Sequence, residues 1–175
     1  MSKALPKEIT AHDLLKTYAV IVMICDHVGF YFFPDNMWWR VIGRTGFPVW
    51  FYLIGHSNSR ELPLKLWLGA LIVAASRLVF GFVLFPLNAL VTIIICRLVI
   101  DGVMIRALKD YDSLFGMFLV MVFLAFPSEL FFEYGSIAVL FAMFGFLMRH
   151  SAEIRIKESA LWAFGLASGI VFCLI

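Results

Sequence analysis

Long apolar runs follow one another along almost the whole chain, with short polar breaks between them. A helix that crosses a membrane needs about 20 mainly apolar residues. Runs near this length are 14–33, 39–57, 63–84, 88–108, 113–128, 132–149 and 158–175. Pro, Asn, Ser and charged residues fill the breaks, as is typical of turns. The pattern predicts an all-α, polytopic transmembrane helix bundle of about seven spans, within a range of about six to eight.

The composition agrees with this pattern. Of 175 residues, 63% are hydrophobic and 15% are charged, whereas soluble domains are about 45–50% apolar and about 25% charged. A small soluble domain leaves much of its surface in water and cannot bury so much apolar area. We therefore expect an integral membrane protein in contact with the lipid bilayer, with residues 1–175 forming a single domain.

Several classes of site and partner are not expected. The net charge is +2 and there is no basic block, so no nucleic acid partner is predicted. Cys25, Cys96 and Cys173 are far apart, without the spacing of metal ligands, so no metal is predicted. The polar N-terminal stretch lacks the apolar core and cleavage site of a signal peptide. The first apolar run is therefore predicted to remain as a membrane helix.

The Lys and Arg residues give an orientation. In a seven-span arrangement, ten of the 14 fall on one side of the membrane. They are Lys3, Lys7, Lys16, Arg60, Lys65, Arg106, Lys109, Arg149, Arg155 and Lys157. The loops on the other side carry Arg40 as their cation. Because cytoplasmic loops are enriched in Lys and Arg, we expect the N-terminus to be cytoplasmic.

A few ionisable residues remain inside the apolar runs. They are Asp26, His27, Arg44, His56, Arg77, Arg97 and Asp101. An Arg or Asp at membrane depth costs about 2.5–3.5 kcal/mol on insertion scales, and such residues usually face the bundle interior and pair. Asp26 is some twelve residues from Leu14, or about 18 Å into the first helix at 1.5 Å per residue. These residues are the functional candidates.

Asp26 and His27 are the most informative pair. Consecutive residues point about 100° apart around a helix, so each is expected to reach a different neighbour. Arg44 or Arg77 is the expected partner of Asp26, and Arg77 as a purely structural counter-ion stays an alternative. Neutral His27 is suited to act as a base or an acid.

Two further charged positions have structural interpretations. Arg97 and Asp101 are four residues apart on one helix face and are predicted to form a structural pair. His56 is near the cytoplasmic end of its run, where it is either solvated or functional.

Four motifs follow one another along the chain, beginning with "LLKTYAVIVMICDHVGFYFF" and "RVIGRTGFPVWFYLIGHSNSR". These two stretches are similar to the opening motif and the next segment of the TraX family. "FPLNAL" and "FFEYGSIAVLFAMF" resemble the third and fourth motifs, so that the likeness covers about residues 14–149. The matching positions are Lys16, Asp26, His27, Gly43, Arg44, Phe47, Pro48, Asn88, Tyr134 and Gly135.

The resemblance implies a multi-pass protein of the bacterial inner membrane. The named member of the family acetylates the N-terminal amine of conjugative pilin, and related membrane acyltransferases use a cytoplasmic CoA thioester. The resemblance thus implies an acyl-CoA-dependent acetyltransferase, with acetyl-CoA or another acyl-CoA as the donor. Its implied partner is a pilin or another membrane-embedded acceptor.

Acyl transfer assigns roles to the candidate residues. A base must take the proton of the acceptor, and donors must stabilise the negative charge that develops on the thioester oxygen. His27 is the expected base, with Asp26 orienting or charging it. The residues expected to contact the substrate, to stabilise the oxyanion or to act as a counter-ion are Arg44, Arg77, Asn88 and Tyr134. The candidates for contact with CoA are Lys16, Arg60 and Lys65.

Two other functions stay open from the sequence. A small transporter would use Asp26, His27 and the arginines as a proton or anion relay. The chain lacks the internal repeat that many transporters show. A non-catalytic membrane subunit would use the same charges to hold neighbouring helices together.

Overall fold

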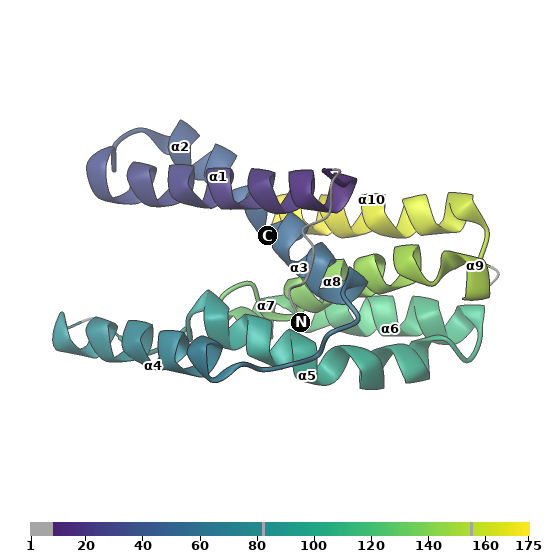
Figure 1. The fold of residues 1–175 in the computed structure, drawn as a ribbon. Coiled ribbons are helices and arrows are strands. Elements are labelled where there is room, and N and C mark those ends of the chain that lie inside the picture. Colours follow the sequence, from purple (N-terminus) through teal and green to yellow (C-terminus); the bar gives the residue numbers. More distant parts are fainter. Residues whose placement is uncertain (1–8, 82, 155) are drawn as a thin grey trace, which may run out of the picture. The chain divides into compact units, whose positions relative to one another are not determined.

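The computed structural model describes residues 9–81, 83–154 and 156–175 (Figure 1). The chain divides into two compact units, the first ending at Trp50 and the second running from Phe51 to Ile175. Throughout these residues the regular structure is helical, with one isolated bridge between Leu87 and Phe132. The prediction of an all-α fold is confirmed.

The first unit is built on a helical hairpin. It contains α1 (Ala11–Phe32) and α2 (Met37–Arg44), which pack closely along each other (Figure 1). The capping residue of α1 is Thr10, whose hydroxyl accepts a hydrogen bond from the backbone N–H of Asp13 at 3.2 Å. Asn36 caps α2 by accepting from the backbone N–H of Trp38. These caps satisfy N–H groups that have no partner inside the helix.

The apolar run 39–57 is two helices rather than the single helix predicted. After α2 ends at Arg44, α3 begins (Gly46–His56). Pro48 has no N–H to donate to the Arg44 carbonyl, so the hydrogen-bond ladder cannot continue through this point. The Thr45 hydroxyl instead donates to the Ile42 carbonyl at 2.7 Å and closes the end of α2.

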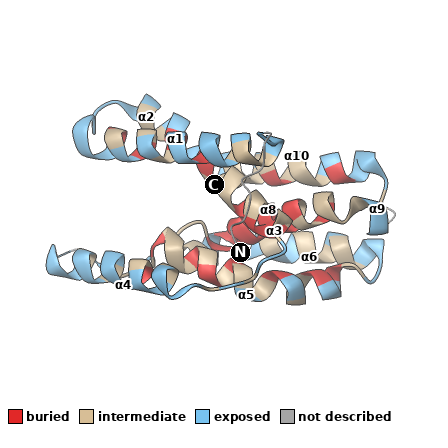
Figure 2. Ribbon diagram, in the orientation of Figure 1, coloured by how far each residue is buried: buried red, intermediate tan, exposed pale blue. Residues whose placement is uncertain are grey.

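The second unit surrounds one central helix, α8 (Gly135–Arg149). Its other elements are α4 (Leu64–Val79), α5 (Ala89–Ala107), α6 (Tyr111–Phe123), α7 (Ala125–Glu129), α9 (Ser151–Ile154) and α10 (Glu158–Leu174). The predicted run 113–128 thus spans α6 and α7, with a break at Leu124. Helices α5, α6, α7 and α10 all contact α8, which carries the densest set of buried residues (Figure 2).

Glycine allows α3 and α8 to touch through their backbones. A Cβ atom placed on Gly55 would overlap the Ala142 carbonyl, and one placed on Gly145 would overlap the Tyr52 carbonyl. Each helix therefore has a glycine where the other comes closest. Small residues at such contacts are typical of helices that associate within membranes, where close backbone approach replaces the hydrophobic effect.

The length of the helices limits what is confirmed about the membrane. Of the described helices, α1, with 22 residues, is long and apolar enough to cross a bilayer. Helices α6, α8 and α10 are apolar but shorter. Helix α5 has 19 residues, but the charged residues Arg97, Asp101 and Arg106 lie within it. Seven spans are therefore not confirmed.

The start of α6 provides a test of acid stability. The Asp110 carboxylate accepts a hydrogen bond from the Ser113 backbone N–H at 2.6 Å, and this bond holds the pKa of Asp110 below its ordinary value of 3.8. A lowered pKa contributes stability that is present above the ordinary value and lost as pH falls through the lowered one. Asp110→Asn keeps a capping oxygen but cannot titrate.

We expect the wild type to lose more thermal stability than Asp110→Asn between neutral pH and about pH 2. Unfolding temperatures of both proteins in one detergent measure this difference. Equal losses in the two proteins would show that the Asp110 carboxylate does not stabilise the fold.

Candidate functional site

An ion pair joins α1 to α2 at the middle of the hairpin. Asp26 is only 8% exposed, and its Oδ2 atom is 3.5 Å from Nη1 of Arg40. The Arg40 guanidinium also lies over the Phe30 ring, 5.0 Å from its centroid. The other carboxylate oxygen, Oδ1, is buried and has no hydrogen-bond partner among the described residues. A buried carboxylate is thus paired with a cation, but one of its oxygens is unsatisfied.

The partner of Asp26 is Arg40, whereas the sequence predicted Arg44 or Arg77. Gly43 packs directly on Asp26, where a Cβ atom would come within 2.5 Å of the Asp26 Cα. Residues 40 and 43 are three apart and share this face of α2, whereas Arg44 is rotated from it by about 100°. Arg44 is exposed and makes no hydrogen bond or ion pair within the part of the chain that the structure describes.

A double-mutant cycle tests this assignment. We expect Asp26→Asn and Arg40→Gln to show a coupling energy of about 0.5–3 kcal/mol, toward the lower end because Arg40 is partly exposed. Asp26→Asn and Arg44→Gln are expected to add without coupling. Unfolding in detergent of the single and double variants measures both energies. Coupling through Arg44 instead of Arg40 would overturn the assignment.

His27 lies next to this pair but does not contact it. The His27 ring is exposed, and its Nδ1 is 2.8 Å from the Met23 carbonyl one turn earlier. A carbonyl oxygen only accepts hydrogen bonds, so Nδ1 carries the proton of this bond. In the neutral ring, Nε2 is then the basic nitrogen. The Met23 carbonyl orients the imidazole, whereas the sequence predicted that Asp26 would do so.

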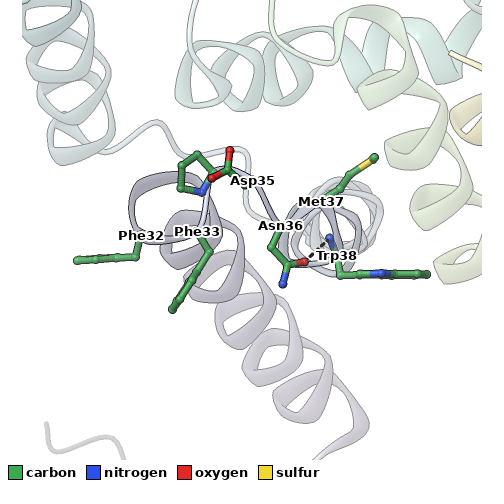
Figure 3. Close-up of a pocket in the computed structure, with 7 residues that line it drawn as sticks. Phe32, Phe33, Asp35, Asn36, Met37 and Trp38 are labelled. Atoms are coloured by element: carbon green, nitrogen blue, oxygen red, sulfur yellow. Dashed lines mark hydrogen bonds between the residues drawn. The ribbon is translucent and has the colours of Figure 1, made fainter.

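A shallow pocket opens at the turn between α1 and α2 (Figure 3). It has a volume of about 580 Å³ and is lined by the consecutive residues 32–38. Phe33 and Trp38 provide much of its aromatic wall, and the Asn36 side chain bonds the Trp38 backbone N–H at 3.2 Å. Its lining includes neither Asp26 nor His27. The two candidate catalytic residues therefore lie outside this pocket.

Three predicted contact residues belong to the second unit. Arg77 donates from Nη1 to the Pro86 carbonyl at 2.9 Å. Asn88 accepts hydrogen bonds from the backbone N–H groups of Leu90 and Val91 and donates to the Ala70 carbonyl at 3.0 Å. These bonds cap α5 and tie it to α4, so the buried Asn88 has a structural position rather than one open to substrate.

Tyr134 begins α8 near Asn88. Leu87 exchanges two backbone hydrogen bonds with the segment 131–133, which brings the "FPLNAL" and "FFEYGS" stretches together. Glu133 strengthens the junction, because its Oε2 accepts from the Ala89 backbone N–H at 2.9 Å. No sequence pattern pointed to Glu133, since no periodicity relates positions 44 residues apart.

The predicted pair of Arg97 and Asp101 is replaced by two longer-range contacts. Asp101 Oδ1 is 3.0 Å from Nε of Arg60. Arg97 donates from Nη1 to the Glu61 carbonyl at 2.6 Å. The loop after α3 lies against α5 and supplies partners for both residues, so the helix-face pairing does not form. Arg60, predicted to face CoA, thus has a structural contact as well.

The remaining candidates are near the surface or at the end of α3. Lys16 is exposed and forms an ion pair with Asp13 at 3.6 Å, and Lys65 is exposed. His56 is half-buried, with its ring 5.7 Å from that of Tyr52, and its backbone carbonyl accepts from Nη1 of Arg149 at 2.6 Å. No sequence pattern indicated this Arg149 contact, which spans 93 residues.

Comparison with known proteins decides the family. The model of the TraX protein family matches residues 11–175. The chain belongs to the TraX family. This match covers both compact units and extends beyond the four motifs, which end at about residue 149. TraX proteins are membrane-associated, in agreement with the apolar α1.

A relative of this TraX chain carries no assigned activity in its name. Over 138 residues the chain is 26% identical to Uncharacterized protein RP591 of Rickettsia prowazekii (strain Madrid E). The alignment covers 79% of this chain and 56% of that protein, so the chain spans little more than half the length of this relative. No solved structure matches the chain.

The TraX motif positions have distinct places in the fold. Asp26 and Gly43 meet where α1 packs on α2, and Pro48 lies in the first turn of α3, just after the break at Thr45. Tyr134 starts α8 in a left-handed conformation with φ of 68°. The motif residues thus lie mainly at helix contacts and ends, with His27 and Arg44 exposed beside them.

Proposed function

We propose that this TraX chain is a membrane acyltransferase that moves an acetyl group from acetyl-CoA to an amine of a pilin-like acceptor. The observation that carries the proposal is the bond from His27 Nδ1 to the Met23 carbonyl. It leaves Nε2 basic on an exposed ring, which is the form that a general base requires. The Asp26–Arg40 pair acts as a positioning element that holds α1 against α2.

The transfer follows from the chemistry of a thioester. His27 Nε2 takes a proton from the acceptor amine as the nitrogen attacks the acetyl carbon. A C–N bond forms and the C–S bond breaks, and the proton passes to the departing CoA thiolate. Negative charge on the acetyl oxygen needs a cationic or N–H donor. The exposed Arg44, with its donors unused among the described residues, is the candidate in the same unit.

Lys16 is suited to bind the anionic end of the donor. It precedes His27 by eleven residues, which corresponds to about 16 Å along α1 and a rotation of only about 20°. Both side chains are exposed on α1 and share one face of it. A long, thin ligand with a negative charge at one end and a thioester at the other fits this spacing.

The membrane setting is part of the proposal. Alongside the apolar α1, exposed apolar side chains cover α4 and α10, among them Leu71, Ile72, Val79, Leu166 and Ile170. Lipid is the environment that accommodates such surfaces. We assign the chain to the bacterial inner membrane as a multi-pass protein with a cytoplasmic N-terminus.

The test is a transfer assay with purified protein in detergent or liposomes. Labelled acetyl-CoA is supplied with a peptide that has a free N-terminal amine and, as control, with the same peptide already acetylated. Transfer of label to the free amine alone, with release of CoA, is the expected result. Absence of both CoA binding and transfer would refute the acyltransferase. Proton flux in liposomes that Asp26→Asn abolishes would favour a relay instead.

A further inference from the structure

Exposed aromatic side chains surround the turn that joins α1 to α2. We call residues 30–38 the aromatic turn. Four of its side chains are each at least 70% exposed, namely Tyr31, Phe32, Met37 and Trp38. Figure 3 shows Phe32 and Trp38 pointing to opposite sides of the turn, and Asp35 pointing in a third direction. The side chains thus surround the turn instead of converging on a ligand in the shallow pocket among them.

Beyond the aromatic turn, the exposed apolar side chains of the hairpin become aliphatic. On α1 they are Val20, Ile21 and Ile24, and on α2 they are Val41 and Ile42. Trp and Tyr have a polar atom on an apolar ring and are enriched at the level of the lipid headgroups, whereas aliphatic side chains face the acyl chains. The order of side chains along the hairpin is therefore that of a structure entering a bilayer.

The length of α1 places the aromatic turn at a membrane surface. Helix α1 has 22 residues, or about 33 Å at 1.5 Å per residue, and the hydrocarbon core of a bilayer is about 30 Å thick. A helix of this length that crosses the core has its last turn at the headgroups. The last residue of α1 is Phe32, and the polar residues Asp35 and Asn36 follow it closely.

Local contacts hold the aromatic turn in one conformation. The rings of Phe33 and Trp39 are stacked, with centroids 5.5 Å apart and planes 9° apart. Trp39 also packs on α1, where a Cβ atom placed on Gly29 would overlap its side chain. The exposed rings are thus carried by a turn that is already ordered, and an ordered surface loses less conformational entropy on binding.

We propose that the aromatic turn binds the headgroup boundary of the phospholipid bilayer and sets the depth of α1. A protein partner would cover one side of the turn, whereas side chains on opposite sides favour a surrounding medium. His27 precedes Phe32 by five residues, so the anchor holds it about 8 Å along α1 from the membrane surface. To the acyltransferase proposed above, on which the anchor itself does not depend, this depth adds an acceptor amine presented at the membrane surface.

Quenching of Trp fluorescence by brominated lipids tests the anchor. Wild type and Trp38→Phe are reconstituted in phosphatidylcholine that carries bromine either near the headgroup or near the chain ends. The difference in emission between the two proteins reports Trp38. We expect shallow bromines to quench this difference more strongly than deep ones, so that Trp38→Phe loses most of the shallow quenching.

Trp50 of the same unit provides the matched control. Its side chain is half-buried, and its Nε1 atom is buried without a partner among the described residues. Trp50→Phe should therefore keep the shallow quenching that Trp38→Phe loses. Loss of that quenching in Trp50→Phe and not in Trp38→Phe would overturn the anchor.

The other outcomes are equally distinct. Quenching of Trp38 mainly by the deep bromines would place the turn at the bilayer centre and overturn the anchor. Quenching by aqueous iodide alone would place the turn in water, and no quenching by either agent would assign it to a protein contact, so each result would overturn the anchor. Shallow quenching without acetyl transfer would support the anchor and refute the acyltransferase alone.

Discussion

Replacing His27 by Gln is expected to lower acetyl transfer by about 10²–10⁴-fold, the usual contribution of a positioned general base. The exposed ring makes one hydrogen bond, from Nδ1 to the Met23 carbonyl, so its loss should leave thermal stability nearly unchanged. Initial rates with labelled acetyl-CoA across a range of pH, together with unfolding temperatures, measure the two effects. A loss of rate with intact folding supports the role of Nε2 as a base.

His150 provides a matched control. Its Nδ1 is 3.1 Å from the carbonyl of Phe146, four residues earlier, which is the arrangement seen at His27. His150→Gln therefore removes the same local bond at a place with no proposed catalytic role. It should retain the wild-type rate. A wild-type rate in both variants would remove His27 from the mechanism. An equal loss of rate in both variants would show that the local hydrogen bond, and not the base, matters.

Replacing Gly43 by Val should destabilise the first unit by about 1–3 kcal/mol or more, the cost of overpacking a close contact. A side chain at this position would overlap Asp26 and push α2 from α1. The Asp26–Arg40 pair would then separate, which adds the penalty of an unpaired buried charge. Unfolding in detergent measures the change, and transfer activity should fall with it because His27 is adjacent.

Gly116 is the control for this effect. It lies within α6, and nothing is within 4 Å of a Cβ atom placed on it. Gly116→Ala should leave stability unchanged or raise it by up to about 1 kcal/mol, because Ala is the better helix former. If Gly43→Val were as stable as Gly116→Ala, the tight contact between α1 and α2 would not exist in the protein.

Local patterns predicted the helices well. Each apolar run of the sequence contains a helix, since apolar stretches bounded by Pro, Asn and charged residues carry the signal themselves. The break at Thr45 was missed because the run 39–57 stays apolar through it, although Pro48 was a visible warning. Length was overestimated for the run 63–84, where α4 ends at Val79, and for the run 132–149, where α8 begins only at Gly135.

Pairings between distant positions were less predictable. Spacing on one helix suggested that Arg97 would neutralise Asp101, but the loop after α3 supplies Arg60 and the Glu61 carbonyl instead. Arg40 was placed in a loop, whereas the turn at residues 33–36 starts α2 early enough to bring it back onto Asp26. Such contacts depend on how the chain folds back, which periodicity does not report.

The continuity of α1 would also limit the choice of donor for the proposed reaction. One uninterrupted helix carries both Lys16 and His27, so their separation of about 16 Å is fixed by residue number and not by loop movement. A small activated acyl compound such as acetyl phosphate has its anionic group next to its reactive carbon and is too short to reach both residues at once. The length of the donor arm would thus select the substrate before any reaction takes place.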